Sequence, residues 1–219
     1  MTPASRYEAT GPEAEFEPGS RGRVLRNVPG IRSARAMART ESEALLVAQE
    51  TLVDRYAAEH RFAAEDVCAI HRTWLGGIYP WAGHYRNVNI AKGNFHFAAA
   101  SQIPRLMQAL EGEALAEHTP CRIADPGEIA VSLAVVHAEL VLIHPFREGN
   151  GRCARLLSLL MAFQAGLPPL DFGPLAGRSL PAYIGAIHAA VSSNYEPMTA
   201  LFKRVIDRTF RQHRGRVAP

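Results

Sequence analysis

The chain has 219 residues, of which 47% are hydrophobic and 21% are charged, and its formal net charge is +3. This composition is normal for a folded globular protein, and the length is enough to bury a core without disulfides or a structural metal. The small net charge suits anionic ligands without demanding them. A domain-wide nucleic-acid footprint would need a clustered basic stripe, for which the C-terminal tail is the one candidate in the sequence.

The cysteines Cys68, Cys121 and Cys153 lie far apart and show no zinc-type spacing. An odd number of isolated cysteines is typical of unpaired thiols in a reducing compartment. No charged leader followed by an apolar run opens the sequence, and no uninterrupted apolar run reaches the length of a membrane helix, about 18 residues. We therefore expect a cytoplasmic protein that makes no membrane contact.

Composition also divides the chain. Residues 1–20 are polar and rich in proline and glycine, which predicts an irregular N-terminal arm that packs on the body in places. One domain is expected over 21–211, followed by a basic C-terminal tail over 212–219.

Helices are expected in the first half of that domain. The sequence TESE at Thr40–Glu43 has the form of a capping box, in which the Thr and Glu side chains each satisfy a free amide. It predicts a helix to about His60, and a second helix is expected over 64–75. A third helix, capped by Ser101, is expected to extend to about Glu117. The expected apolar face of the first helix consists of Ala44, Leu45, Ala48, Leu52 and Tyr56.

The helical period is lost at Tyr85–Ala98. Arg86, Val88 and Ile90 alternate there with their neighbours, the letters AKGN can turn the chain, and FHF returns. The pattern predicts a β-hairpin. Because a short hairpin is marginal alone, we expect it to lie on a helical body.

Two buried helices are expected in the second half. Asp125 and Pro126 supply a cap and a first-turn proline, and nearly every position from Glu128 to Ile143 is apolar, as in a central buried helix. Pro145 disfavours helical geometry at the residue before it, so this helix should end there.

A leucine-rich helix should follow from Arg152 to about Ala165, with Gly166 as its stop. Two further helices are expected over 180–192 and 197–211. We therefore predict an all-α fold of seven or eight helices around a central buried pair, with one β-hairpin.

The loop between the two buried helices is HPFREGNGRCAR, His144–Arg155. The first amides of a helix have no partner within it and lie at the positive end of its dipole. Gly149 and Gly151 carry no side chain that would keep an anion away. The loop therefore predicts a phosphate site.

Charged residues of the same loop add to the predicted phosphate site. Arg152 and Arg155, three residues apart, can direct two guanidinium groups to one anion. Glu148 would repel a phosphate directly but suits Mg²⁺, which bridges carboxylates and phosphate oxygens. His144 has a pKa range suited to proton transfer. Together they indicate phosphoryl or nucleotidyl transfer.

A dinucleotide site is the competing interpretation of these glycines. GNGRCA fits G-x-G-x-x-G/A, with Asp171 about 20 residues beyond it. That fingerprint requires a preceding strand and repeated βαβ units. The apolar run before it begins with a helix cap and is too long for a strand, so we reject this interpretation.

HPFREGNGRCAR resembles the signature of the Fic family, H-x-F-x-[DE]-G-N-G-R-x-x-R, at every specified position. The hairpin YRNVNIAKGNFHF resembles the family's target-clamping flap, and VLRNVPGI at Val24–Ile31 resembles the N-terminal arm of its bacterial toxin branch. The resemblance covers most of residues 20–210 and implies the Fic fold.

It also implies an activity, the transfer of AMP from ATP to a Ser, Thr or Tyr hydroxyl of a target protein. His144 would be the general base, Glu148 would hold Mg²⁺ or Mn²⁺ between the α- and β-phosphates, and Phe146 would anchor the loop. The target segment would pair with the flap backbone as an added strand.

The remaining implied roles concern the nucleotide. Arg152 would hold the β-phosphate and Arg155 the γ-phosphate. The implied anion hole consists of Gly149, Asn150 and Gly151. The implied flap residues near nucleotide and target are Lys92 and Gly93. Tyr183, Asn194 and Tyr195 are candidates for the adenosine side, with core packing as the alternative for the tyrosines.

Other conspicuous residues are interpreted structurally. His137 is expected to be a hydrogen-bonded core histidine, and Trp74 and Trp81 are expected in the core. Cys153 occupies a variable position of the signature and is given no role.

Regulation is the next expectation. Many Fic proteins carry an inhibitory helix, [ST]-x-x-x-E-[GN], whose Glu pairs with the second Arg of the signature. The nearest string here is SSNYEP at Ser192–Pro197, which fails at its last position. We therefore expect a separate small antitoxin protein and no internal inhibition.

Three alternatives stay open. A Fic-fold transferase could use another donor, passing on phosphate, UMP or phosphocholine, although the intact GNGR is unlike the phosphorylating branch. A catalytically silent interaction module is a second alternative. Direct nucleic-acid binding through the basic C-terminal residues is less favoured than a solvated helix face. The sequence does not identify the target protein. The resemblance to the toxin branch suggests DNA topoisomerase subunits as targets.

Overall fold

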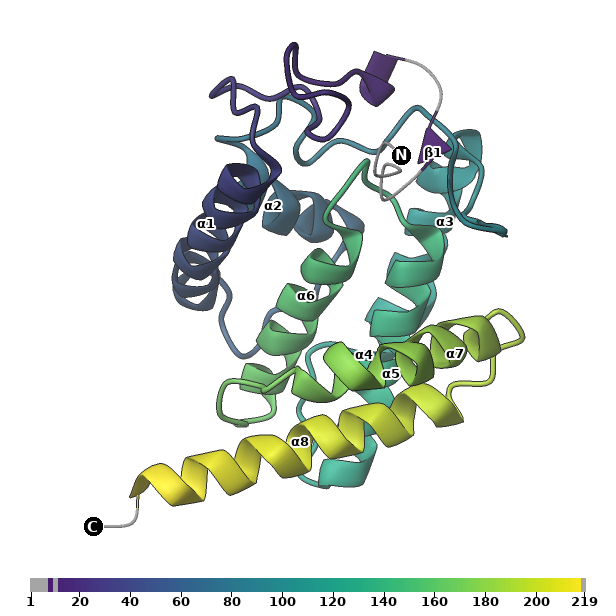
Figure 1. Ribbon diagram of the computed structural model, residues 1–219. Coiled ribbons are helices and arrows are strands. Elements are labelled where there is room, and N and C mark those ends of the chain that lie inside the picture. Colours follow the sequence, from purple (N-terminus) through teal and green to yellow (C-terminus); the bar gives the residue numbers. More distant parts are fainter. Residues whose placement is uncertain (1–7, 10–11, 218–219) are drawn as a thin grey trace. The chain divides into compact units, whose positions relative to one another are not determined.

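The computed structural model describes residues 8–9 and 12–217 (Figure 1). The all-α class is confirmed, with one small sheet among the described residues. The α-helices are α1 (Ala34–Arg55), α2 (Ala64–Leu75), α3 (Ile103–Leu110), α4 (Ala116–His118), α5 (Pro126–Ile143), α6 (Asn150–Gln164), α7 (Leu180–Ala190) and α8 (Glu196–Val217). The shorter helical segments are η1 (Pro12–Ala14), η2 (Ala100–Gln102), the π-helix η3 (Glu111–Leu115), η4 (Gly173–Leu175) and η5 (Gly177–Ser179).

The chain divides into two compact units, each built from separate stretches of sequence. The first consists of Met1–Arg55, Ala64–Gln108 and Ile143–Cys153. The second consists of Tyr56–Ala63, Ala109–Leu142 and Ala154–Pro219. The prediction of a single domain over 21–211 stays a prediction.

A three-stranded antiparallel sheet lies in the first unit. Its strands are β1 (Glu8–Ala9), β2 (Ile90–Lys92) and β3 (Phe95–His96), in the order β1-β2-β3. The predicted hairpin is confirmed as β2 and β3, and it is shorter than its sequence pattern. The sequence did not predict β1, because two residues within the arm carry no alternation that could be recognised.

Helix α1 begins earlier than predicted. The predicted capping box is wrong, because Thr40 lies inside the helix. Ser33 precedes the helix instead, and its Oγ accepts a hydrogen bond from the amide of Ala36 at 3.3 Å. The helix formers of ARAMAR extend it back to this alternative cap. Two residues of the predicted apolar face, Ala48 and Leu52, are nevertheless buried.

The predicted cap at Ser101 is also wrong. Ser101 lies within η2, whose N-cap residue Ala99 makes no side-chain cap hydrogen bond. The helical run predicted to about Glu117 is confirmed as a succession of η2, α3, η3 and α4 that ends at His118, with the wide π-turn of η3 within it.

The segment Val24–Ile31, which follows the predicted arm, is held in place by polar contacts within the first unit. The side chain of Asn27 donates to the carbonyls of Leu25 and Ile31 and accepts from the amide of Ile31. The amide of Val28 donates to the carbonyl of Ile78 at 2.9 Å. Residues 1–7 and 10–11 of the predicted arm lie outside the described residues.

In the second unit, α5 begins as the sequence predicts. The carboxylate of Asp125 accepts a hydrogen bond from the amide of Glu128 at 2.9 Å, closing the first turn. Helix α5 is the one described helix long and apolar enough to cross a membrane, and 61% of it is buried inside the protein. Burial of this kind is typical of a core helix, as its all-round apolar sequence predicts.

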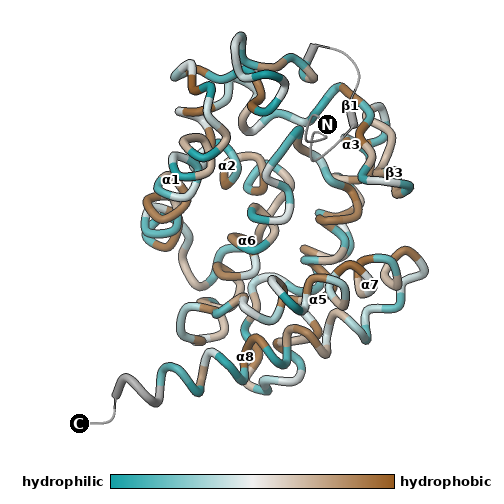
Figure 2. Tube along the Cα trace, viewed as in Figure 1, coloured by the Kyte–Doolittle hydropathy of each residue, from teal (hydrophilic) through white to brown (hydrophobic). Residues whose placement is uncertain are grey.

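Helix α8 packs against α7 and η4 in the same unit. Figure 2 shows hydrophobic and hydrophilic residues alternating along α8, and its apolar residues form a buried face. The helix continues past the predicted end at Arg211 to Val217, so the segment predicted as a basic tail is helical over its described part. The buried face consists of Met198, Leu201, Phe202, Val205 and Ile206.

Candidate active site

His144 follows directly on the end of α5. Its backbone is left-handed, with φ of 53°, a conformation that L-residues other than glycine adopt at a cost of about 1–2 kcal/mol. The side chain is buried, and its ring stacks on that of Phe97 with centroids 3.7 Å apart. Phe97 follows directly on strand β3, so the C-terminal end of the flap hairpin covers the histidine.

Arg86 holds the backbone of this histidine in place. It is buried, and its Nε donates to the carbonyl of His144 at 2.8 Å. Its two terminal nitrogens donate to the carbonyls of Val88 and Ala98, each at 2.6 Å. Arg86 thus connects the residues that flank the hairpin on both sides to the start of the loop. Burial lowers the pKa of Arg86 to about 10, so it stays charged at neutral pH.

Asn150 closes the loop on itself. Its Oδ1 accepts from the amide of Phe146 at 2.8 Å, and its Nδ2 donates to the carbonyl of the same residue at 2.7 Å. The side chain is buried and bonds the backbone of Phe146 at both ends of its amide, so it serves the loop itself, and the backbone N–H is the group that Asn150 offers to the predicted anion hole. Phe146 itself is fully buried and stacks on His71 with centroids 3.8 Å apart, which suits the predicted anchoring role.

His71 supports the loop from α2. Its Nδ1 accepts from the amide of Gly83 at 2.9 Å, so its Nε2 carries the proton and donates to the carbonyl of Glu148 at 3.0 Å. Burial lowers the pKa of His71 to about 4. The histidine is therefore a neutral support at physiological pH.

The two glycines of the signature have different roles. Gly149 has φ of +86°, and a Cβ there would lie 2.8 Å from the Trp74 ring. Backbone and packing both demand glycine at this position. A Cβ on Gly151 would meet nothing within 4 Å among the described residues, so open space lies beside the first turn of α6.

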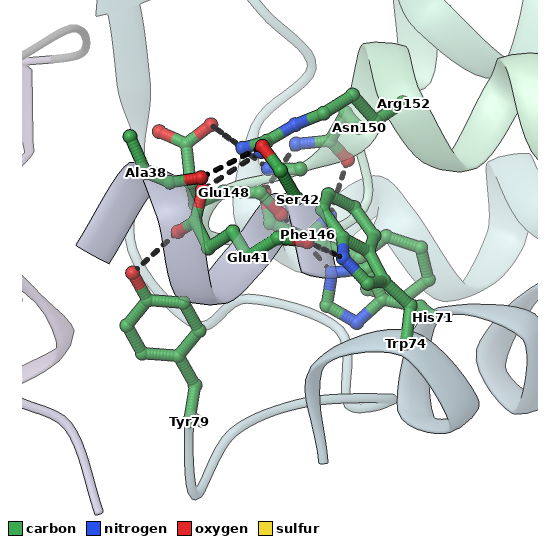
Figure 3. Close-up of polar contacts among 11 residues, drawn as sticks. Ala38, Glu41, Ser42, His71, Trp74, Tyr79, Phe146, Glu148, Asn150 and Arg152 are labelled. Carbon is green, nitrogen blue, oxygen red and sulfur yellow. Dashed lines mark hydrogen bonds and ion pairs between the residues drawn. The ribbon is translucent and has the colours of Figure 1, made fainter. Parts of the chain in front are cut away.

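Charged side chains gather at the same turn (Figure 3). Nη1 of Arg152 contacts a carboxylate oxygen of Glu41 at 2.7 Å, and its Nη2 lies 3.8 Å from Glu148. The guanidinium also lies over the Trp74 ring, 4.5 Å from its centroid. Glu41, Glu148 and Arg152 line a cavity of about 300 Å³ together with Arg23 and Arg147.

Arg147, at a variable position of the signature, connects the loop to the arm. It is buried, and its Nε donates to the carbonyl of Glu13 at 2.9 Å. The arm is therefore part of the wall around the loop.

Lys92 is the exposed last residue of β2, and Gly93 follows it in the exposed turn to β3. Gly93 has φ of +58°, which the turn requires. The structure brings neither residue to a described partner in the loop, and their nucleotide role stays a prediction.

The remaining predicted residues belong to the second unit. Nη2 of Arg155 donates to the carbonyl of Leu175 at 3.2 Å, and its Cζ lies 5.9 Å from the ring centroid of Tyr183. The hydroxyl of Tyr183 bonds Nε2 of His137 at 2.8 Å, and Ser158 contacts the other ring nitrogen. The prediction that His137 is a hydrogen-bonded core residue is confirmed.

Tyr195 and Asn194 also make local contacts. The hydroxyl of Tyr195 donates to Glu139 at 2.5 Å, and Asn194 accepts from the amide of Glu196 at the start of α8. These contacts give both residues structural roles, and their adenosine role stays a prediction.

Five supporting residues escaped the sequence analysis as site residues: Glu41, His71, Trp74, Tyr79 and Arg86. Only Glu41 left a usable signal, because an acidic residue on the same helical face as Met37 and Ala48 is out of place. The capping-box interpretation obscured it.

Comparison with known proteins places the chain beside one family. The Fic/DOC family matches residues 61–162. Protein adenylyltransferase VbhT from Bartonella schoenbuchensis is 32% identical over 208 residues, which cover 91% of this chain and 40% of that protein. The chain thus spans well under half the length of this curated relative.

In two further comparisons, the match covers a larger share of the similar protein. Probable protein adenylyltransferase y4lH from Sinorhizobium fredii is 30% identical over 63% of this chain and 70% of its own length. The N-terminal Fic domain of a cell filamentation protein from Bartonella quintana, a VirB-translocated Bep effector protein solved with bound ADP, is 25% identical. It matches with a TM-score of 0.66 over 83% of this chain and 89% of that one.

Proposed function

The chain belongs to the Fic/DOC family, and on that premise we propose that it is a protein adenylyltransferase, which transfers AMP from ATP to a hydroxyl of a target protein. One observation carries the proposal. Within the first unit, a single loop presents His144, the carboxylate of Glu148, the N-terminus of α6 and the guanidinium of Arg152. The relatives named as adenylyltransferases support the same activity.

The nucleotide binds through its phosphates in this proposal. The first amides of α6 and the open space at Gly151 receive the phosphate chain. Arg152 holds the β-phosphate. Arg155, three residues further along α6, holds the γ-phosphate.

The residues present fit a magnesium ion that arrives with ATP. Among the described residues, no group of three acidic, histidine or cysteine side chains could form a protein-built metal cage. Glu148 nevertheless brings a carboxylate to the cavity that Arg152 lines, and Mg²⁺ is usually held by one or two carboxylates plus substrate phosphates and water. Bound there, the ion would neutralise charge on the phosphate oxygens.

His144 performs the proton transfer. Its imidazole accepts the proton of the target hydroxyl, whose oxygen forms a bond to the α-phosphorus of ATP. The bond between that phosphorus and the oxygen bridging to the β-phosphate breaks, and pyrophosphate leaves. Arg86 and Phe97 fix the backbone and the ring of His144 before the substrates arrive.

The target lies along the flap in this proposal. Backbone pairing with β1 already uses one edge of β2, in the register Glu8↔Ala91 and Ala9↔Ile90. An added target strand would therefore pair with β3 or displace β1. Either arrangement reads the backbone of the target more than its side chains.

Regulation and partners follow from the resemblance. We propose that a separate small antitoxin supplies a glutamate to Arg155, that the targets include DNA topoisomerase subunits, and that the protein acts in the cytoplasm. Mixing the purified chain with topoisomerase subunits and α-labelled ATP tests the second of these directly.

Substitution of His144 tests the activity. The chain and its His144→Ala variant are incubated with Mg²⁺, a cell lysate and ATP labelled on the α-phosphate. We expect label on a protein with the intact chain and a loss of at least a hundredfold in the variant, since general bases contribute about 10²–10⁴-fold.

The alternatives give other outcomes. Transfer from γ-labelled ATP alone would indicate phosphorylation. Labelling that UTP or a phosphocholine donor supports better than ATP would indicate another donor. No transfer from any donor would leave an interaction module.

A further inference from the structure

Glu41 is a buried carboxylate with a complete set of partners. It lies in the middle of α1 and is 7% exposed. One carboxylate oxygen accepts from the hydroxyl of Tyr79 at 2.7 Å, and the other receives Nη1 of Arg152 at 2.7 Å. Burial and the neighbouring carboxylate raise the pKa of Tyr79, so its hydroxyl remains a donor.

Trp74 links the backbone of Glu41 to the signature loop. Its indole nitrogen donates to the carbonyl of Glu41 at 2.9 Å. The face of its ring lies under the guanidinium of Arg152 and against Gly149. Figure 3 shows these side chains gathered around Arg152. The guanidinium is thus held at its edge by Glu41 and on its face by Trp74.

We propose that Glu41 is a positioning residue, which orients Arg152 so that its remaining N–H groups meet the β-phosphate of the nucleotide. The proposal rests on the proposed function. Arginine has five N–H donors, and the contact with Glu41 leaves most of them for a ligand. A long side chain ordered in advance loses less entropy when the phosphate binds.

The competing role for Glu41 is occlusion, in which it blocks Arg152 until it is displaced. Burial and bonding oppose that role. Both carboxylate oxygens are engaged, and a displaced Glu41 would leave a buried charge that has lost its partner, which is costly. Arg152, at 25% side-chain exposure, remains open to the cavity while paired.

The ligand series AMP, ADP and ATP separates these roles without requiring catalysis. Binding of each nucleotide to the chain and to Glu41→Gln is measured by calorimetry in the presence of Mg²⁺. Loss of one charge-assisted hydrogen bond to Arg152 should weaken ADP and ATP about tenfold. AMP has no β-phosphate, so its affinity should not change.

Two further variants keep the test decisive. Tyr79→Phe removes only the hydroxyl that orients Glu41, and we expect a smaller loss that is also selective for ADP over AMP. Glu43→Gln is the matched control, because Glu43 is exposed on the same helix, where it forms an ion pair with Arg39. It should bind all three nucleotides as the unaltered chain does.

Three results would overturn the proposal. Tighter ADP binding or faster labelling by Glu41→Gln would mean occlusion. Equal weakening of AMP and ADP would mean general structural damage, and unchanged ADP binding would mean no role. Should Glu41→Gln fail to fold, Tyr79→Phe decides among the same outcomes. A chain that binds ADP but transfers no AMP would refute the proposed function and leave this inference standing.

Discussion

Single residues of the signature divide into those that build the loop and those that face a ligand. Gly149 and Asn150 build it. Gly149 has a positive φ and packs against Trp74. The side-chain amide of Asn150 bonds both the N–H and the carbonyl of Phe146. Gly151 has open space beside it. The signature therefore combines structural and functional requirements within three consecutive residues.

Alanine at each glycine should separate these requirements. Gly149→Ala should destabilise the protein strongly, since φ is positive and the Cβ meets Trp74. Gly151→Ala should leave thermal stability unchanged or slightly raised, because it replaces glycine in a helix. The same variant should reduce ATP-dependent labelling at least tenfold, because its Cβ enters the space assigned to phosphate. Melting temperatures and labelling rates measured side by side check both, and a stable Gly149→Ala would contradict the first.

At the scale of elements, the flap and the signature loop are joined by the hydrogen bonds of one side chain. Arg86 bonds the residues that flank the hairpin on both sides and the carbonyl of His144, so the position of the flap and the conformation of the histidine depend on each other. Sequence alternation placed Arg86 in a strand pattern but could not assign His144 as its partner, because that residue lies 58 positions further along the chain.

Substitution of Arg86 should therefore affect stability and activity together. Arg86→Lys retains the charge but lacks the planar fork that reaches three carbonyls. We expect a loss of about 2–3 kcal/mol in unfolding free energy, measured by urea denaturation, with reduced labelling. Arg105→Lys, at an exposed position on α3, is the control. An unchanged urea midpoint for Arg86→Lys would show that the planar guanidinium contributes nothing to the stability of the fold.

At the scale of the whole molecule, each unit buries a neutral histidine. His71 in the first unit and His137 in the second are both buried, and burial lowers the pKa of His71 to about 4 and that of His137 to about 3. Unfolded histidine has a pKa near 6.5. Between these values the unfolded chain binds protons that the folded chain does not, so stability falls as the pH falls below about 6.5.

The pH dependence of unfolding checks this expectation. Between pH 7 and pH 5 each histidine should cost on the order of 2 kcal/mol of stability. His71→Gln keeps a donor for the carbonyl of Glu148 and cannot titrate, so its stability should depend less steeply on pH. His84→Gln, at an exposed position, should keep the full dependence. Parallel curves for all three proteins would rule out a contribution from His71.

The sequence by itself determined the order of helices, the hairpin, the buried helix that leads into the signature and the content of the loop. These features are local, because helical period, caps and a contiguous motif involve residues near one another in the chain. Its errors were also local choices between equivalent signals, as when Ser33 rather than Thr40 precedes α1.

Only the tertiary structure decided which distant residues support that loop. Glu41, Trp74 and Arg86 come from three separate segments, and β1 reaches the flap from the start of the chain. A buried carboxylate or guanidinium is stable only where packing supplies its partners. Which partners these are depends on contacts between segments that no local pattern records.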